Sequence, residues 1–176
     1  MNILIQFAHP YPNRSKVNRA LMEAVQDLPN VRVNDLYALY PKLYVDVERE
    51  QALLREADWV VFQHPFYWYS APALLKEWMD VVLEQGFAYG QGATALHKKI
   101  WLHSVTTGMA DHAYTHDGLN EATMNELLKP FERTARFCGM IWKDPLIFHG
   151  AHDADESRIN QHAQTLRNRL PIHFEL

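Results

Sequence analysis

The sequence predicts a single α/β domain, built on a parallel five-stranded sheet in the doubly wound order 2-1-3-4-5. Two observations support this fold class. Short apolar runs alternate with segments of helical periodicity, and the 176 residues, taken as one domain over 1–176, contain no Gly-, Ser- or Pro-rich linker. Strict alternation favours a sheet covered by helices on both faces, which gives three layers. Five strand–helix units are too few for an eight-fold barrel.

The first two units lie in the N-terminal third of the chain. Residues 3–8 form an apolar run typical of a strand buried on both faces, and residues 16–28 carry apolar side chains at helical spacing. Residues 31–36 alternate as a second strand. Residues 48–57 follow as a second helix, with Ala52, Leu53 and Ala57 on one face.

Three further units complete the pattern. Residues 59–62 form the third strand, and Pro72 suits the first turn of a helix whose apolar stripe reaches Val82. The other predicted elements are a strand over 100–105, a helix over 124–136, a strand over 145–148 and a last helix over 155–170.

Composition excludes several classes of protein. The chain is 48% hydrophobic and 22% charged with a formal net charge of -4, which is typical of a soluble globular protein. Its 17 Lys and Arg are scattered, so no nucleic-acid partner is expected. No apolar stretch is long enough to cross a membrane, and no basic segment precedes the first strand, so we expect a cytoplasmic protein. Cys138 is the one cysteine; its apolar neighbours predict a core position, with a reactive thiol as the alternative.

In such sheets ligands bind outside the carboxyl ends of the strands, so the loops after strands one, three and four matter most. The first loop reads "AHPYPNRSKVN", with Ser15 where the helix begins. A serine there caps the helix, whose free N–H groups and dipole attract an anion. His9, Arg14, Ser15 and Asn18 would donate to a phosphate; the alternative is an ordinary cap beside a surface histidine. Neither G-x-x-x-x-G-K-[ST] nor G-x-G-x-x-G is present, which disfavours a P-loop or Rossmann ligand.

The second loop places four adjacent rings, Phe66, Tyr67, Trp68 and Tyr69, between two prolines. An aromatic turn beside a phosphate site presents a flat face and backbone N–H groups to a planar ring system, and flavin mononucleotide (FMN) has that shape. The alternative is that the rings fill the core or a subunit contact.

The third loop begins with the small polar turn Thr106, Thr107 and Gly108, which lets a ligand approach the backbone closely. Tyr114 and His116 follow and are candidate proton donors to a reduced ring. His116 and the histidine at position 112 have the spacing of a helical metal pair, but the surrounding Gly and Asp residues favour a loop, so no metal is expected.

These loops carry a resemblance to a known family. "AHPYPNRSKVN", "FQHPFYWYSAPALLKEWMD", "QGFAYGQGATALHKK" and "TTG" followed by Tyr114 resemble the flavodoxin-like NAD(P)H:quinone oxidoreductases over roughly the first 150 residues. "DLYALYPKLYVDVEREQALL" and the short C-terminus most resemble the bacterial ancillary proteins of the glutathione-gated Kef potassium-efflux systems. The resemblance implies a flavodoxin-like three-layer sandwich and a homodimer with the helix after Pro72 and "GFAYG" at its interface. It also implies peripheral docking on an antiporter at the inner face of the cell membrane.

The resemblance also implies a cofactor site. It predicts FMN, with FAD as the alternative, and NAD(P)H as the hydride donor. The cofactor-binding residues would be His9, Ser15, Lys16, Val17 and Asn18 at the phosphate, Phe66, Tyr67, Trp68 and Tyr69 at the ring edge, and Thr106, Thr107, Gly108 and Met109 on its other side. Met109 stands where the family's T-T-G-G has its second glycine.

Tyr114 matches a family tyrosine that stabilises reduced flavin, whereas Asn120 occupies the position of the family's histidine. His116 is the substitute candidate, so Tyr114 and His116 are the predicted catalytic residues. The resemblance implies a two-electron, ping-pong NAD(P)H:quinone oxidoreductase that also regulates a Kef-type antiporter. The alternative is a non-catalytic, flavin-binding regulatory subunit. A one-electron flavodoxin is disfavoured because the chain lacks T-x-T-G-x-T and a strongly acidic surface.

Overall fold

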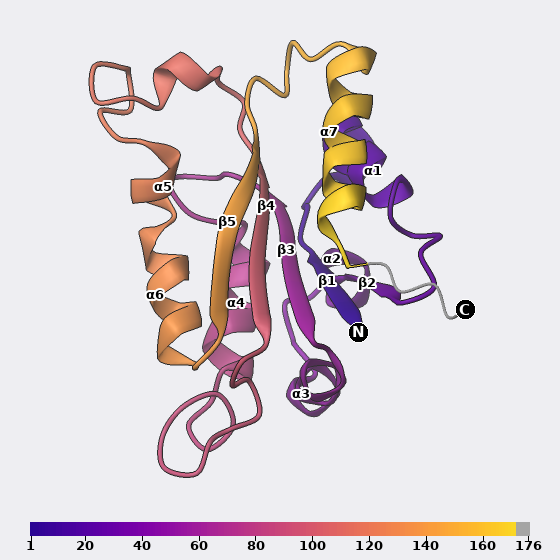
Figure 1. The fold of residues 1–176 in the computed structure, drawn as a ribbon, viewed down its shortest axis with the longest axis vertical. Coiled ribbons are helices and arrows are strands. Elements are labelled where there is room, and N and C mark those ends of the chain that lie inside the picture. The colour runs from indigo at the N-terminus through magenta and orange to yellow at the C-terminus, as the bar shows by residue number, and fades with distance from the viewer. Residues whose placement is uncertain (172–176) are drawn as a thin grey trace.

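Five parallel strands form the centre of the molecule in the order β2-β1-β3-β4-β5, as Figure 1 shows. This computed structural model describes residues 1–171; the last five residues of the predicted domain lie outside the described part. The strands are β1 (Ile3–Phe7), β2 (Val31–Asp35), β3 (Trp59–Pro65), β4 (Ile100–Thr106) and β5 (Ile141–Phe148). The predicted doubly wound topology is therefore confirmed.

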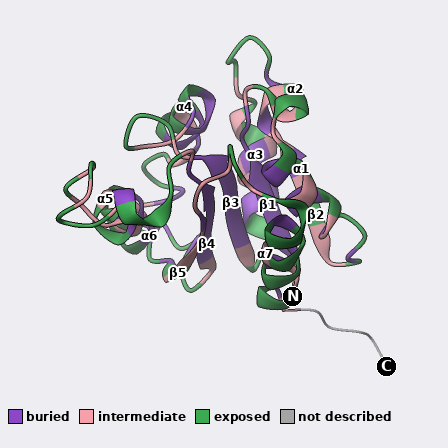
Figure 2. Cartoon of the chain, turned by 90° about the horizontal axis from the view of Figure 1, so that it is seen from above, coloured by how far each residue is buried: buried purple, intermediate pink, exposed green. Residues whose placement is uncertain are grey.

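Helices cover both faces of the sheet (Figures 1 and 2), and the sheet separates two hydrophobic cores. On one face α1 (Lys16–Glu23) packs against α7 (Glu156–Arg169), over Ile5 and Val61. The opposite core, around Phe62 and Trp101, is covered by α2 (Leu36–Leu39), α3 (Val47–Glu56), α4 (Ala73–Val82), α5 (Met124–Leu127) and α6 (Lys129–Phe137). Two short 3₁₀ helices, η1 (Pro12–Arg14) and η2 (Asp111–Ala113), lie in the loops after β1 and β4.

Several element boundaries differ from the prediction. The helix expected over 124–136 is divided at Leu128 into α5 and α6, and Pro130 occupies the first turn of α6, where a missing N–H costs no hydrogen bond. β5 begins at Ile141, four residues before the predicted start, and its Pro145 is tolerated because β5 is an edge strand. The single turn α2 was not predicted, and α1 ends at Glu23 rather than at residue 28.

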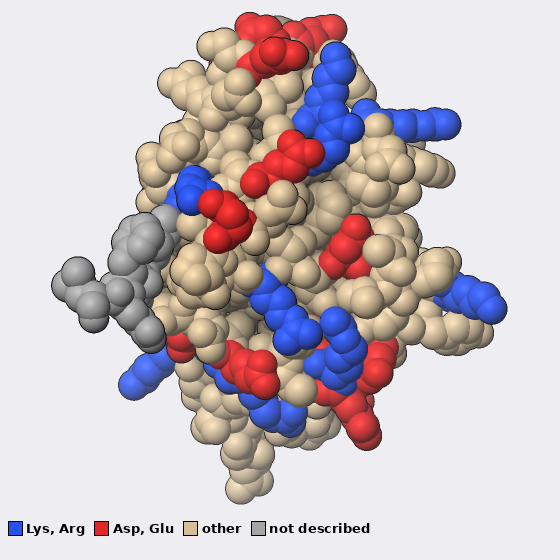
Figure 3. Space-filling model, turned by 90° about the vertical axis from the view of Figure 1, so that its right-hand side faces the viewer, with Lys and Arg blue, Asp and Glu red and all other residues tan. Residues whose placement is uncertain are grey.

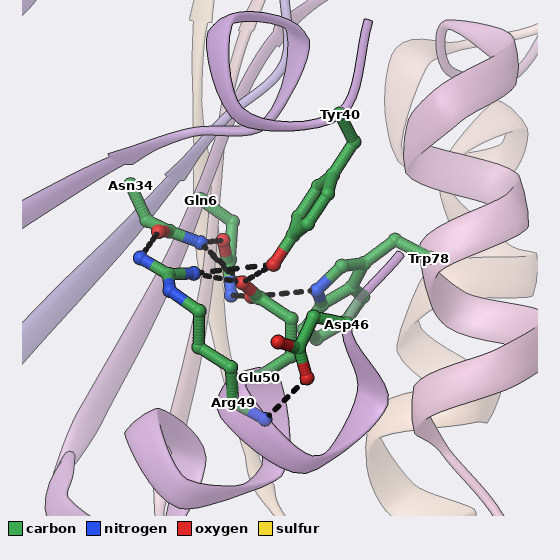
Figure 4. A network of polar contacts seen from close by, with 7 residues as sticks. All are labelled: Gln6, Asn34, Tyr40, Asp46, Arg49, Glu50 and Trp78. Carbon is green, nitrogen blue, oxygen red and sulfur yellow. Dashed lines mark hydrogen bonds and ion pairs between the residues drawn. The ribbon is translucent and has the colours of Figure 1, made fainter. Parts of the chain in front are cut away.

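A buried carboxylate joins the helices of one face to the sheet (Figure 4). Glu50 of α3 is fully buried, and its two oxygens accept hydrogen bonds from β1, β2, α4 and the segment after α2. The donors are Gln6 Nε2 at 3.0 Å, Asn34 Nδ2 at 2.9 Å, Tyr40 Oη at 2.7 Å, Trp78 Nε1 at 2.8 Å and the Arg49 guanidinium. Burial and the neighbouring Glu50 raise the pKa of Tyr40 to about 12, so the phenol keeps its proton.

Surface and core composition follow the sequence analysis in two respects. On the face seen in Figure 3, acidic and basic side chains are interspersed. Cys138 is buried, as predicted, and burial raises the pKa of its thiol to about 11, which disfavours the reactive thiolate. None of the helices within residues 1–171 has the length and apolar character needed to span a membrane.

Candidate functional site

A cavity of about 360 Å³ lies at the carboxyl ends of β1, β3 and β4, where the doubly wound order changes direction. We call it the switch-point cavity. Its volume lies within the range of small-molecule and cofactor sites. Its lining comes from three predicted loops and from one that was not predicted: His9, Tyr11, Arg14, Ser15, Lys16, Asn18, Pro65, Phe66, Tyr67, Thr106, Thr107, Gly108, Ala151 and His152.

Ser15 caps α1 at the floor of this cavity. Its Oγ accepts the backbone N–H of Asn18 at 3.2 Å and the Asn18 side-chain amide at 2.9 Å. Both bonds use the oxygen as acceptor, so the hydroxyl hydrogen is left to donate to a ligand. The N–H groups of Lys16 and Val17 belong to the first helical turn and have no carbonyl partner within the helix. Ser15 therefore caps α1 as predicted, and the N-terminus of this helix has free donors that suit an anion.

Asn18 of α1 connects Ser15 to β3 and β4 through hydrogen bonds. Its amide nitrogen donates to Thr106 Oγ1 at 2.9 Å as well as to Ser15, and its Oδ1 accepts from Gln63 Nε2 at 2.6 Å. The side chain is 1% exposed. Both of its N–H hydrogens are therefore engaged within the protein, and Asn18 shapes the switch-point cavity without contributing a spare donor.

His9 supplies a donor of defined tautomer. Its Nδ1 accepts the backbone N–H of Tyr11 at 3.0 Å, and burial lowers the pKa of the imidazole. The ring is therefore neutral near pH 7, with its proton on Nε2. The Arg14 Cζ atom lies 5.6 Å from the centroid of the Tyr11 ring. The side chain of Val17 is buried in the core, so only its backbone can contact a ligand.

The aromatic loop is a strained hairpin turn. Tyr67 and Ser70 form a bridge through reciprocal backbone hydrogen bonds of 3.3 and 2.9 Å, and the two residues between them have positive φ angles of 48° for Trp68 and 61° for Tyr69. Positive φ at both central residues is the signature of a type I′ turn, which normally contains Asn or Gly. Aromatic residues there cost roughly 1–2 kcal/mol each.

The four rings differ in their surroundings. Phe66 packs edge-on against Tyr69 and Tyr114, with ring centroids 6.3 and 6.2 Å apart. Phe66 and Tyr67 line the switch-point cavity, whereas Trp68 projects outward with 93% of its surface exposed. The core-filling alternative therefore accounts for none of the Trp68 ring.

We predict that Trp68→Gly raises the free energy of unfolding by about 1 kcal/mol, because glycine adopts positive φ without strain. Thermal unfolding should show a rise of about 2–4 °C. Tyr44→Gly is the matched control, since Tyr44 is 85% exposed and is not among the residues with positive φ. A lower melting temperature for Trp68→Gly would contradict strain in this turn.

The loop after β4 contacts the loop after β5, which was not predicted to line the switch-point cavity. A Cβ on Gly108 would lie 2.7 Å from His152 Nε2, so the absence of a side chain allows the two loops to approach. His152 and Ala151 come from the loop after β5, which sequence reasoning did not include. Met109 is 40% exposed and does not line the switch-point cavity.

The structure separates the two predicted catalytic residues. Tyr114 is half-buried against Phe66, and burial raises the pKa of its phenol despite a lowering contribution from Thr107. His116 is exposed and lies 3.6 Å from Glu126 in an ion-pair geometry. Neither residue lines the switch-point cavity.

Known proteins are similar in sequence to this chain across nearly its whole length. A family model described as a flavodoxin-like fold matches residues 1–170. The glutathione-regulated potassium-efflux system ancillary protein KefG of Pectobacterium carotovorum is 48% identical over 173 residues, which cover 96% of this chain and 94% of that protein.

Solved structures agree with the fold but carry several names. The general stress protein 14 of Treponema denticola, in complex with FMN, superposes with a TM-score of 0.90 at 34% identity, covering 96% of this chain and 97% of that one. An NADPH-quinone reductase of P. pentosaceus gives 0.88 at 32%, with the same coverage. A structure described as a thermophilic tryptophan halogenase from Streptomycin violaceusniger gives 0.92 at 40%, covering 97% and 99%.

Proposed function

Since the chain belongs to the flavodoxin-like family, and is 48% identical to a KefG ancillary protein over 96% of its length, we propose that it is an FMN-dependent NAD(P)H:quinone oxidoreductase. We further propose that it serves as an ancillary regulator of a Kef-type potassium-efflux antiporter. Bound FMN would carry two electrons as a hydride from NAD(P)H to a quinone, in ping-pong order.

The observation that supports this proposal most directly is the composition of the switch-point cavity. Part of its lining is the N-terminus of α1 with the spare Ser15 hydroxyl, which suits a phosphate. Another part is formed by Phe66, Tyr67 and the Thr106–Gly108 turn, which suit the edge of a planar ring. Asn18 fixes Ser15 and Thr106 relative to each other through hydrogen bonds to both.

The residues of this chain would bind and orient the reactants. His9 Nε2 and Ser15 Oγ would donate to the phosphate, with Arg14 and Lys16 as nearby positive charges. The exposed Trp68 ring would cover a reactant stacked over the flavin, and exclude water from it. Because NAD(P)H and quinone would use the same face, they would bind in turn.

Partnership is the second part of the proposal. The exposed rings of Trp68 and Tyr69, 93% and 54% exposed, suit a contact with a second copy of the chain, and we propose a homodimer. The apolar stripe of α4 predicted at that contact is buried within the subunit, at Trp78 and Val82 for example. Docking on an antiporter would place the protein at the inner face of the membrane through its partner. The competing function is a flavin-binding regulatory subunit without turnover.

The test begins with the absorbance spectrum of the purified protein between about 350 and 500 nm, where bound flavin absorbs. Anaerobic NADPH should bleach the flavin bands, and a simple quinone should restore them. Bands that never bleach would favour the regulatory subunit. Failure to bind FMN or FAD after reconstitution would refute the cofactor assignment, and sedimentation of the same sample gives the oligomeric state.

We predict that Ser15→Ala weakens FMN binding about 10-fold, because it removes one charge-assisted hydrogen bond to the phosphate along with the helix cap. Fluorescence titration of FMN measures the change. Ser157→Ala is the control, since Ser157 is an exposed serine in the first turn of α7, outside the switch-point cavity. Equal affinities of the two variants would place the phosphate elsewhere.

A further inference from the structure

His149 lies where the unpredicted loop after β5 meets the turn after β4. Its Nδ1 is 3.1 Å from Thr107 Oγ1. Two backbone bonds join the same segments, from Gly150 N to Met109 O and from Ala151 N to Thr107 O, both 2.8 Å. His149 is therefore held against the back of the turn whose front, at Thr107, lines the switch-point cavity.

Hydrogen-bond accounting fixes the tautomer of His149. The Thr107 hydroxyl has one hydrogen, and it donates this hydrogen to Met109 O at 2.8 Å. The contact between Thr107 Oγ1 and His149 Nδ1 is a hydrogen bond only if Nδ1 is the donor. The neutral imidazole thus carries its proton on Nδ1 and leaves Nε2 as the site where a second proton binds.

A second cavity lies beyond this imidazole. It measures about 560 Å³ and is lined by His149 together with Asp111, Arg158 and His162; we call it the outer cavity. Arg158 Nη2 donates to the His149 carbonyl at 2.9 Å, and the Tyr114 ring lies 5.3 Å from the imidazole. Burial lowers the pKa of His149, and Arg158 lowers it further; Asp111 opposes them but does not reverse the shift. The outer cavity is open to solvent, so the imidazole that lines it can exchange protons with water.

We propose that His149 is a positioning residue for the turn Thr107–Met109, and that its protonation on Nε2 presents a positive charge behind this turn to the switch-point cavity. This inference rests on the proposed flavin function. It gives His149, in the loop after β5, a role that the sequence analysis gave to His116, which is exposed and lies 3.6 Å from Glu126.

The charge of His149 can change without a change in its hydrogen bond to Thr107. Nδ1 keeps its proton in both charge states, so the hydrogen bond to Thr107 survives titration. Protonation of Nε2 then changes the electrostatic potential in the switch-point cavity without moving the turn. A more negative ligand, such as two-electron-reduced FMN compared with oxidised FMN, should gain affinity when His149 becomes a cation.

The geometric half is tested on the flavin-free protein by ¹⁵N NMR of the histidine rings. We expect the chemical shift of His149 Nδ1 to remain that of a protonated nitrogen across the titration. The chemical shift of Nε2 should move from that of an unprotonated nitrogen to that of a protonated one. A neutral His149 protonated on Nε2 would overturn the hydrogen-bond assignment. This readout does not depend on cofactor binding, so it separates failure of this inference from failure of the proposed function.

The electrostatic half is tested by the ratio of the dissociation constants of reduced and oxidised FMN as a function of pH. In the wild-type protein this ratio should fall about 10-fold as His149 is protonated. The fall is measured relative to the pH dependence of a variant that lacks the histidine. His149→Asn keeps a donor near the Nδ1 position but cannot titrate, so its affinity for oxidised FMN should stay within about 3-fold and the extra pH dependence should disappear.

His149→Phe keeps a ring against Tyr114 but has no donor, so it should weaken both forms of FMN about 10-fold. His97→Gln is the control, because His97 is exposed and packs near Gly139, before β5 begins, whereas His149 follows the end of that strand. A wild-type pH dependence in His149→Asn would overturn the proposal. Loss of that dependence in His116→Asn instead would assign the charge to His116.

Discussion

Replacing Glu50 with alanine is expected to lower the free energy of unfolding by about 3–5 kcal/mol, the largest single effect we predict for this chain. The side chain is fully buried, and its carboxylate pairs with Arg49 while accepting bonds from two strands, from α4 and from Tyr40 after α2. Removing it leaves the Trp78 and Tyr40 donors without their acceptor and the guanidinium without its counter-ion.

Urea unfolding at pH 7 measures this loss. Glu48→Ala is the control, because Glu48 lies in the first turn of the same helix and is exposed, so its change should stay within about 0.5 kcal/mol. Glu50→Gln should fall between the two, since the amide keeps one acceptor but loses the charge. A loss below about 1 kcal/mol for Glu50→Ala would mean that the donors find water or other partners.

The network also marks the limit of sequence periodicity. The alternation of apolar runs and helical patterns was sufficient to predict five strands in the observed order. Helical spacing places Glu50 on the same face as Leu53 and Ala57, three and seven residues further on. What the spacing does not reveal is the set of partners for the carboxylate, because Gln6 of β1 and Asn34 of β2 are distant in the sequence. The start of β5 was missed for a related reason: Lys143 and Asp144 interrupt its apolar run, which an edge strand tolerates.

The candidate site likewise has a part that the sequence predicts and a part that it does not. The loops after β1, β3 and β4 were predicted because their side chains have recognisable chemistry, such as the cap at Ser15 and the turn at Gly108. The loop after β5 adds His152 to the switch-point cavity and His149 behind it through backbone hydrogen bonds, which leave no sequence signature. The available signal was "FHGAH", a glycine between histidines at the end of the last strand, where Gly150 has φ +68°.

Lowering the pH from about 6.5 to 4 is expected to destabilise the fold through two histidines on adjacent strands. His64 of β3 and His103 of β4 are fully buried, with His64 Nε2 3.2 Å from His103 Nδ1. His64 Nδ1 donates to Pro65 O at 2.9 Å, so His64 Nε2 accepts the proton of His103 Nδ1. His103 Nε2 has no hydrogen-bond partner within residues 1–171. The pair is therefore complete only when both rings are neutral.

The sign of the pH dependence follows from the pKa shifts. Burial lowers the pKa of His64 to about 4, and burial with the neighbouring His64 lowers the pKa of His103. The unfolded chain, with pKa values near 6.5, binds protons first as the pH falls. The stabilising contribution is thus complete above about pH 6.5 and is lost towards pH 4, at a cost of about 3 kcal/mol from His64 alone.

Urea unfolding between about pH 7 and 5 isolates the histidines from most carboxylates, which titrate lower. His103→Phe should make the slope in this range shallower, because phenylalanine fits among Phe62, Phe131 and Trp142 and cannot be protonated. His97→Gln, an exposed histidine, should retain the wild-type slope. An unchanged slope in His103→Phe would contradict the pair as the acid-sensitive element.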